Sequence, residues 1–351
     1  MKRIGILTFH SVTNYGAILQ CCGLYSVCRK LNPEALVEVV NYQPYQALKE
    51  YFRTGLYKPK DIFYLLKYVR FVLFGRKNLT LSGPPMYTKK SLQKLHARYD
   101  TLIVGSDEVW RLGGIRGYDY SYFLDFCDDG THRIAYAVSS SNRAKKDDYN
   151  KEVVILLNKF DFISVRDSYT KNFILPLINS DITEVLDPTF LFDYKIITSA
   201  KKVSSDKYIL IYAGIDEKDA IPICEYAKAH SLKIISVNRR LSFADKSFPY
   251  IDPGRWLAFF QSADLIVTEF YHGMIFALKN EKKFVMLKHP GKAAKVEGLT
   301  EKLGITHLLV DSPLTIEKIQ LCIDNIDYSS INEILLKLQD SSYNFLSEAL
   351  G

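Results

Sequence analysis

The chain has 351 residues, of which 48% are hydrophobic and 24% are charged. This is the composition of an ordinary globular protein, and the length exceeds what one hydrophobic core usually supports, so two domains are expected. The net charge of +7 is a mild basic excess that favours anionic small molecules or a phospholipid surface. No basic stripe with interleaved aromatic residues occurs, so no nucleic-acid partner is expected.

The six cysteines lack the spacing of a metal site or a redox pair, so we expect reduced thiols and no metal centre. The apolar run at residues 4–9 is too short for a signal peptide. No uncharged stretch approaches the roughly 20 residues that cross a bilayer. We therefore expect a cytoplasmic protein, in contact with the inner membrane face only at its periphery if at all.

The chain opens with a strand, a loop and a helix. Residues 3–9 form the predicted strand, and after a polar loop residues 17–32 carry apolar side chains at helical spacing. Residues 37–42 are the next predicted strand, which gives the order of a Rossmann-like unit. The first turn has no GxGxxG pattern, and this argues against a dinucleotide.

Residues 57–79 form an apolar and aromatic stretch with interspersed cations. Such a stretch could lie on a membrane, with its apolar face among the headgroups and its cations on anionic lipid. More often it is a helix packed on its own domain, and both readings stay open. The cations are Lys58, Lys60, Lys67, Arg70, Arg76 and Lys77.

Several apolar runs end in polar residues. The run that ends at Gly105 is followed by Ser106, Asp107 and Glu108, and a later run ends at Arg166. The carboxyl ends of strands meet at one edge of an open α/β sheet. The polar residues at these ends are therefore expected to assemble a site.

The second half of the chain repeats the alternation of strands and helices. A polar, turn-rich stretch at residues 198–207 indicates a linker, and residues 331–350 have the spacing of an amphipathic helix. We therefore predict a first domain over residues 1–195, a second over residues 196–330, and a C-terminal helix over residues 331–351.

His272 lies at a predicted junction between a strand and a helix. The apolar run before it is short and β-branched, and Gly273 follows it at the start of an apolar helix. A helix N-terminus at the end of a parallel strand offers N–H groups and a positive dipole end to an anion. His272 would then lie beside that anion as a proton donor. The alternative is a histidine that caps the helix or fills a polar notch.

Six short segments carry a family resemblance when they are taken together: ILTFHSVTNYGAILQ, LIVGSDEVWR, IAYAVSSS, FISVRD, VLDPTFL and YHGMIFAL. Their order and contexts resemble the polysaccharide pyruvyl transferase family, from about Arg3 to the region of Leu308. The resemblance implies an α/β fold of two Rossmann-like domains facing a cleft, similar to GT-B glycosyltransferases. The first domain would hold the acceptor and the second the donor, and the C-terminal helix would cross back to the first.

The resemblance also implies a reaction. The enolpyruvyl group of phosphoenolpyruvate would be transferred to a sugar, as a cyclic ketal on two hydroxyls, with release of phosphate. The expected acceptor is a lipid-linked oligosaccharide of a capsule or other cell-surface glycan. Phosphoenolpyruvate is a co-substrate, and no cofactor is expected. Arg166 and His272 match positions that the family associates with phosphoenolpyruvate, whereas Phe270 stands where the family has a serine.

The donor residues suit this chemistry. The planar guanidinium of Arg166 would bind the donor carboxylate, unless it forms a surface salt bridge with Asp167. The N–H groups of Gly273 and Met274 would hold the phosphate. His272 in its charged form would protonate the vinyl carbon.

Asp107 is the first candidate for the base that accepts the hydroxyl proton, ahead of Glu108 and Glu269. It could instead cap a following helix. Asn14 on the acceptor side could also be a turn residue before Gly16. Amides and aromatic faces commonly hold sugars, and the expected acceptor residues are His10, Asn14, Tyr15, Ser106, Asp107 and Trp110.

Two other functions stay open. A GT-B nucleotide-sugar glycosyltransferase would place a diphosphate at the same helix N-terminus and use a carboxylate such as Glu297. A non-catalytic relative would keep the fold and bind a glycan. The loss of the family serine at Phe270 supports that second alternative, whereas Arg166 and His272 count against it.

Overall fold

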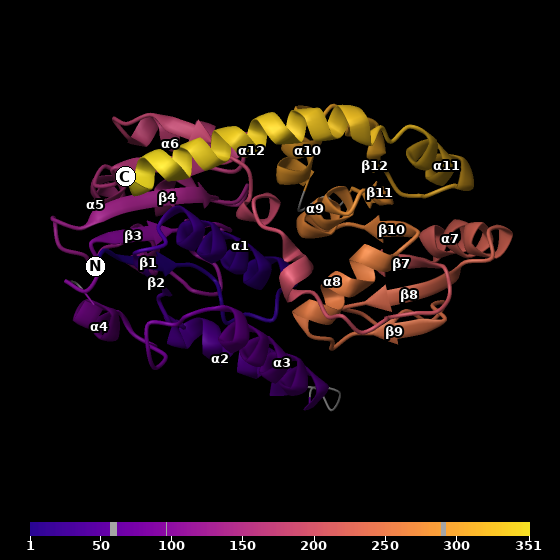
Figure 1. The fold of residues 1–351 in the computed structure, drawn as a ribbon, viewed down its shortest axis with the longest axis horizontal. Coiled ribbons are helices and arrows are strands. Elements are labelled where there is room, and N and C mark those ends of the chain that lie inside the picture. The colour runs from indigo at the N-terminus through magenta and orange to yellow at the C-terminus, as the bar shows by residue number, and fades with distance from the viewer. Residues whose placement is uncertain (57–61, 96, 289–292) are drawn as a thin grey trace. The chain divides into compact units, whose positions relative to one another are not determined.

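The computed structural model describes residues 1–56, 62–95, 97–288 and 293–351 (Figure 1). The chain divides into two compact units, one of residues 1–192 with 337–351 and the other of residues 193–336. The sequence-based divisions fall after residues 195 and 330. Both ends of the chain belong to the first unit.

The first unit contains a sheet of six parallel strands in the order β2-β1-β3-β4-β5-β6 (Figure 1). The order reverses between β1 and β3, and ligands of open α/β sheets bind at such a switch point. All four residues of β3 are buried, as expected of a parallel strand covered on both faces. The strands are β1 (Arg3–Leu7), β2 (Leu36–Val39), β3 (Thr101–Val104), β4 (His132–Val138), β5 (Phe162–Val165) and β6 (Ile182–Glu184).

Helix α1 (Tyr15–Leu31) follows β1 and is capped by Asn14. The Asn14 side-chain oxygen accepts hydrogen bonds from the N–H groups of Gly16 at 3.0 Å and Ala17 at 3.4 Å. Because the cap satisfies these N–H groups, the helix begins before residue 17, its predicted start. The other helices of this part are α2 (Tyr45–Leu56), α3 (Ile62–Asn78), α4 (Lys89–Leu92), α5 (Lys151–Leu157) and α6 (Ser168–Ile174).

The C-terminal helix α12 (Tyr328–Leu350) belongs to the first unit from Lys337 onward (yellow in Figure 1). The hydroxyl of Ser342 accepts a hydrogen bond from the N–H of Leu186 at 2.9 Å. The side-chain amide of Gln339 donates to the carbonyl of Phe190 at 2.7 Å. These bonds join the end of the chain to the segment that follows β6.

The second unit contains its own sheet of six parallel strands, in the order β12-β11-β10-β7-β8-β9. Counted from β7, this is the order of the dinucleotide-binding Rossmann sheet, with its switch point between β7 and β10. The strands are β7 (Tyr208–Tyr212), β8 (Lys233–Val237), β9 (Lys246–Phe248), β10 (Leu265–Thr268), β11 (Lys283–Leu287) and β12 (Leu309–Val310). The helices are α7 (Glu217–Ala229), α8 (Pro253–Ser262), α9 (Tyr271–Lys279), α10 (Ala293–Lys302) and α11 (Ile316–Asp324).

Helix α9 starts directly after β10, and Gly273 makes this close approach possible. A Cβ atom at this position would lie 2.1 Å from Thr268 Oγ1 and 3.0 Å from Tyr212 Cδ1. The Thr268 hydroxyl donates to the Tyr212 carbonyl at 2.9 Å and accepts from the Phe270 N–H at 3.2 Å. Moving it away would break these two hydrogen bonds. Glycine at this position is therefore required by the packing of the helix on its own strand.

We expect Gly273→Ala to lower the free energy of unfolding by about 1–3 kcal/mol, the usual cost of overpacking a tight site. The matched control is Gly298→Ala in α10, where an added Cβ meets no atom within 4 Å. That change should leave stability unchanged or raise it by up to about 1 kcal/mol, since alanine favours helices. Thermal or urea unfolding measures both, and equal stability of the two variants would contradict the packing argument.

Candidate functional site

Arg166, directly after β5, lies in a buried cluster of charges at the carboxyl end of the first sheet. Its Nη1 donates to Asp187 Oδ2 at 2.9 Å and its Nη2 donates to Asp107 Oδ1 at 3.0 Å. The side chains of Arg166 and Asp187 are completely buried, and that of Asp107 is 15% exposed. The alternative of a surface salt bridge with Asp167 is wrong, because Asp167 instead caps α6 by accepting from the N–H of Thr170.

The two terminal nitrogens of Arg166 therefore already bind carboxylates of the protein. Two carboxylates share one guanidinium. Asp187 is held further by the N–H of Thr189 at 3.0 Å and its hydroxyl at 2.7 Å. Asp187 is not among the candidates predicted from the sequence, although it lies in the segment VLDPTFL. The guanidinium fork predicted to bind a substrate carboxylate binds Asp107 and Asp187 in this structure.

Asp107 has an unusual backbone conformation, with φ of 85°. A non-glycine residue in such a region costs about 1–3 kcal/mol and persists only where its surroundings fix it. The side chain accepts from the N–H of Glu108 at 2.8 Å, in addition to the bond from Arg166. No helix starts here, since the next helical residues are Tyr120–Phe123, capped by Asp119. The helix-capping alternative for Asp107 is therefore wrong.

The hydroxyl groups that follow β4 support the Asp107 segment. The N–H of Ser139 donates to the Asp107 carbonyl at 2.9 Å. The hydroxyl of Thr170 donates to Ser139 Oγ at 3.4 Å and accepts from the N–H of Ser140 at 3.0 Å. These three hydroxyl residues are buried and bond to one another. These bonds hold Ser139, whose N–H bonds to the backbone of Asp107.

Ser106 belongs to a second buried network. Its N–H and its hydroxyl both donate to Gln20 Oε1, at 3.1 and 3.0 Å. The Gln20 amide donates to Thr8 Oγ1 at 2.9 Å, and the Thr8 hydroxyl donates to the Ser106 carbonyl at 3.0 Å. Ser106 is completely buried. Its hydroxyl therefore holds β1, α1 and the Asp107 segment together and does not face a sugar acceptor.

The predicted aromatic acceptor residues lie in the core. Trp110 is completely buried and stacks on Phe123, with ring centroids 5.6 Å apart. Tyr15 is also buried; it packs against Phe71, and the ammonium of Lys67 lies 4.7 Å from its ring centroid. These rings present no open face to a sugar, which corrects the roles predicted for Trp110 and Tyr15. Asn14 is the N-cap of α1, a role that neither the acceptor prediction nor the turn alternative gave it.

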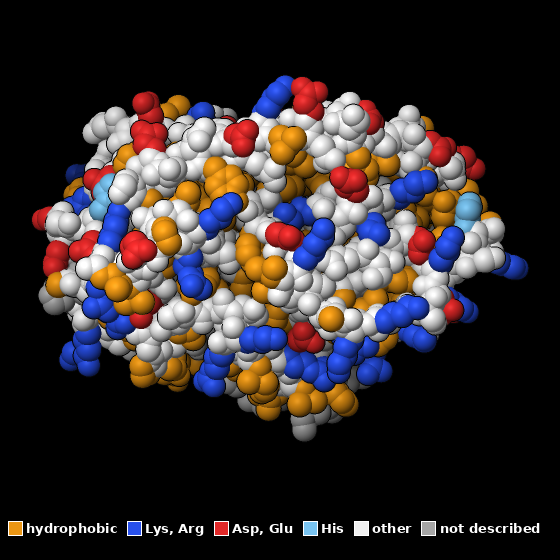
Figure 2. All heavy atoms as spheres, viewed as in Figure 1, with side chains coloured by type: hydrophobic (Ala, Val, Ile, Leu, Met, Phe, Trp, Pro, Cys, Tyr) orange, Lys and Arg blue, Asp and Glu red, His pale blue; other side chains and the backbone are white. Residues whose placement is uncertain are grey.

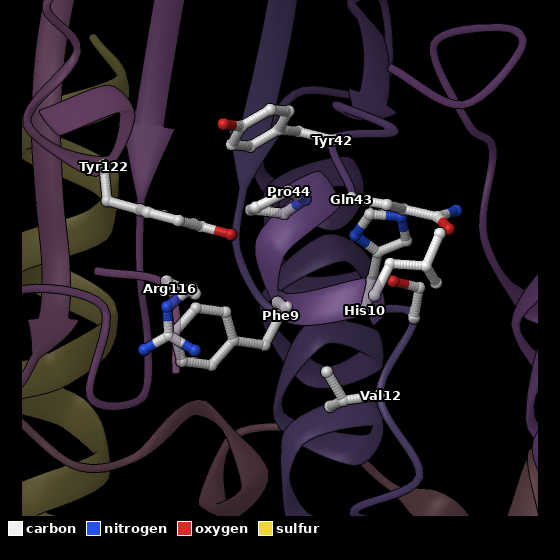
Figure 3. Close-up of a pocket in the computed structure, with 11 residues that line it drawn as sticks. Phe9, His10, Val12, Tyr42, Gln43, Pro44, Arg116 and Tyr122 are labelled. Carbon is white, nitrogen blue, oxygen red and sulfur yellow. The ribbon is translucent and has the colours of Figure 1, made fainter. Parts of the chain in front are cut away.

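His10 lines a small pocket at the carboxyl ends of β1 and β2 (Figure 3). Its Nδ1 lies 3.2 Å from the Thr8 carbonyl, and its Nε2 lies 3.1 Å from Asn41 Oδ1. Burial lowers the pKa of His10. Both ring nitrogens are engaged within the protein, so His10 is a poor proton donor to a substrate.

In the second unit, the residues after β7 and β10 meet at the switch point of the sheet. The N–H of Gly214 donates to Glu269 Oε1 at 3.2 Å. His272 follows as the second residue of α9 and is half-buried. The Met274 N–H already donates to the Phe270 carbonyl at 3.1 Å, which corrects its predicted role in phosphate binding.

Phe270 is the N-cap residue of α9 and makes no side-chain capping bond. The serine that the family resemblance predicts here would supply a capping oxygen to the first turn. Phenylalanine supplies none, so its side chain does not compete with an anion for the N–H groups of that turn.

Two of the buried cysteines carry thiols of low reactivity. Burial raises the pKa of Cys22 and of Cys28 to about 12, which keeps these thiols protonated. Within the part of the chain that the structure describes, no three His, Cys, Asp or Glu side chains gather where they could hold a metal.

Two of three comparisons with known proteins find matches. The family model described as polysaccharide pyruvyl transferase matches residues 14–290. No protein in the curated set has a matching sequence. Among solved structures, the UDP-GlcNAc 2-epimerase of Neisseria meningitidis bound to UDP-GlcNAc has a TM-score of 0.53 at 11% identity, over 100% of this chain and 97% of that one.

Two further structures share the fold. MnaA of S. aureus with UDP gives a TM-score of 0.52 at 12% identity, over 99% of this chain and 91% of its own. The alpha-glucosyltransferase AGT in complex with UDP gives 0.51 at 10% identity, over 99% and 95%. At these identities the likeness shows the fold alone. The predicted α/β class and GT-B-like fold are confirmed.

Removal of the Asp187 carboxylate should destabilise the first unit. Breaking a buried ion pair from one side costs about 3–5 kcal/mol, and here the Arg166 charge loses the completely buried one of its two partners. We expect Asp187→Ala to lower the free energy of unfolding by about that amount. The control is Asp181→Ala at an exposed position just before β6, which should change it by no more than about 0.5 kcal/mol. Urea unfolding that does not distinguish the two variants would refute this structural role.

Proposed function

Because this chain belongs to the polysaccharide pyruvyl transferase family, we propose that it transfers the enolpyruvyl group of phosphoenolpyruvate to a glycan as a cyclic ketal. The observation that carries the proposal is the family match, which spans both Asp107 and His272.

The reaction needs one acid and one base. His272 in its charged form protonates the vinyl CH₂ of phosphoenolpyruvate, and positive charge then develops at C2. One sugar hydroxyl attacks C2 and gives its proton to Asp107. The second hydroxyl displaces phosphate, which leaves with a proton. The two hydroxyls release two protons in all. One makes up for the proton that His272 donated, and the other leaves with phosphate.

Arg166 acts through Asp107 in this proposal. Its fork is occupied by Asp107 and Asp187, so we assign it a positioning role. It orients the Asp107 carboxylate, and 15% of that side chain is exposed for a hydroxyl. The first turn of α9, where the Phe270 side chain gives no cap, supplies N–H groups and a dipole end for the donor phosphate.

The first experiment combines purified protein, phosphoenolpyruvate and a panel of oligosaccharide acceptors. Phosphate release and product mass measure transfer. We expect His272→Gln, which keeps a hydrogen-bond donor but delivers no proton, to lower kcat by about 10² to 10⁴-fold. Donor binding should weaken less, because the helix N–H groups remain.

The control is His307→Gln, at an exposed position in the same unit, which should leave turnover unchanged. Near-normal turnover of a folded His272→Gln protein would remove His272 as the acid. Transfer from a nucleotide sugar, with none from phosphoenolpyruvate, would favour a glycosyltransferase instead.

We propose further that α3 contacts a membrane that carries a lipid-linked acceptor. No helix within the described ranges is long and apolar enough to span a bilayer. Figure 2 shows hydrophobic side chains at the lower edge of the view, over α2 and α3, with Lys and Arg side chains nearby. The exposed apolar residues of α3 are Phe63, Leu65, Leu66, Val69 and Leu73.

The cations of this segment divide into three groups. Arg70, Arg76 and Lys77 are exposed and could contact anionic lipid. Lys67 is buried over Tyr15, where desolvation lowers its pKa to about 8. This corrects the expectation that Lys67 faces the lipid. Lys58 and Lys60 lie outside the described residues.

The double change Val69→Asp with Leu73→Asp should weaken co-sedimentation with anionic vesicles by about tenfold or more. The reason is that full burial of each such side chain contributes about 1.5–3 kcal/mol. The matched control is Ile155→Asp, which replaces an exposed apolar residue on α5 of the same unit. If vesicle binding is absent, or if the double variant binds as well as the control, α3 is only a packed helix.

A further inference from the structure

The pocket in Figure 3 contains a cation that the proposed reaction does not use. The pocket lies in the first unit, next to the switch point between β1 and β3. Arg116, from the connection between β3 and β4, reaches into it. The guanidinium carbon of Arg116 lies 3.7 Å from the ring centroid of Phe9 and 5.7 Å from that of Tyr122.

The orientation of Arg116 is fixed from two sides. Phe9 stacks beneath the guanidinium, and Nη2 donates to the Glu108 carbonyl at 3.2 Å. Among the residues that the structure describes, no carboxylate lies within ion-pair distance of Arg116. Its contacts are therefore aromatic rings and one neutral carbonyl, which orient the charge but do not neutralise it.

Aromatic rings that pack on one another form the walls next to this cation. Phe9 packs edge-on against Tyr122, with ring centroids 5.3 Å apart, and Tyr42 lies 6.0 Å from Tyr122. The Tyr42 hydroxyl is held by Asp119 at 2.8 Å. Figure 3 shows Pro44 and the Tyr122 hydroxyl on the side of the pocket that faces the Phe9 ring. Apolar walls lower the local dielectric, so an anion that enters would interact strongly with the guanidinium.

We propose that this pocket binds the acidic group of an acceptor sugar, with Arg116 as the residue that selects it. The pocket is small, so it receives a carboxylate or a phosphate instead of a whole sugar ring. The guanidinium forms two parallel charge-assisted hydrogen bonds with either group. The aromatic walls contact the C–H face of the sugar beside it. The inference rests on the proposed function for the existence of a glycan acceptor.

The position of Arg116 links this pocket to the proposed base. The Glu108 carbonyl that it binds belongs to the residue directly after Asp107. An acid anchored on Arg116 would therefore place its sugar at a fixed distance from the Asp107 carboxylate. Arg116 is a specificity-determining residue in this scheme and takes no part in bond formation.

The test is equilibrium binding in the absence of phosphoenolpyruvate. Methyl glucuronide, glucose 1-phosphate and methyl glucoside are titrated separately into the full-length protein. We expect one or both acidic sugars to bind more tightly than methyl glucoside by about tenfold to a hundredfold, the contribution of a charge-assisted hydrogen bond. The preferred acidic sugar identifies the group as a carboxylate or a phosphate.

Arg116→Gln should abolish this preference and leave the binding of methyl glucoside unchanged. Arg116→Lys keeps the charge but loses the planar fork, and should retain part of the preference. The control is Arg143→Gln, which removes an exposed cation from the same unit. It should bind all three sugars as the unmodified protein does. Unfolding midpoints of the variants verify that each remains folded.

Two results would overturn the inference: equal binding of acidic and neutral sugars, or an equal loss of the preference in Arg143→Gln. The binding test needs no turnover, so it is separate from the proposed function. A protein that prefers acidic sugars but never releases phosphate would uphold the pocket and refute the transferase.

Discussion

The buried guanidinium of Arg166 is the interaction on which the candidate site of the first unit depends. A charge removed from water is stable only with close partners, and here Asp107 and Asp187 provide them at 3.0 and 2.9 Å. The three residues follow β3, β5 and β6, so one cation ties three strand ends together. It also helps to fix Asp107 in a backbone conformation that would otherwise be unfavourable.

The second unit depends on a steric constraint instead of a charge. Helix α9 approaches β10 so closely that only Gly273 fits against Thr268. The approach places His272 in the first turn of the helix, three residues after Glu269, which directly follows the strand. Phe270 caps the helix without a side-chain acceptor. The same short segment thus combines a titratable ring with a helix N-terminus that suits an anion.

The pattern of hydrophobic residues along the sequence predicted most of the fold. The apolar runs that became β1, β3 and β5 were recognisable because parallel strands are buried on both faces. The three-residue strand β9 and the two-residue strand β12 were not predicted, since such short edge strands carry too few residues for a pattern. The order of strands within each sheet also lay beyond prediction, because it depends on which distant segments pair.

The sequence by itself determined that polar residues follow the strands, and it identified Asp107, Arg166 and His272 as candidates. Only the tertiary structure decided their partners. Arg166 bonds to carboxylates 59 and 21 residues away and not to the adjacent Asp167. An aromatic residue after a strand, such as Trp110, looks the same in sequence whether it faces a ligand or the core. Which remote residues come into contact depends on the strand order and on the packing. A local sequence pattern contains no information on either.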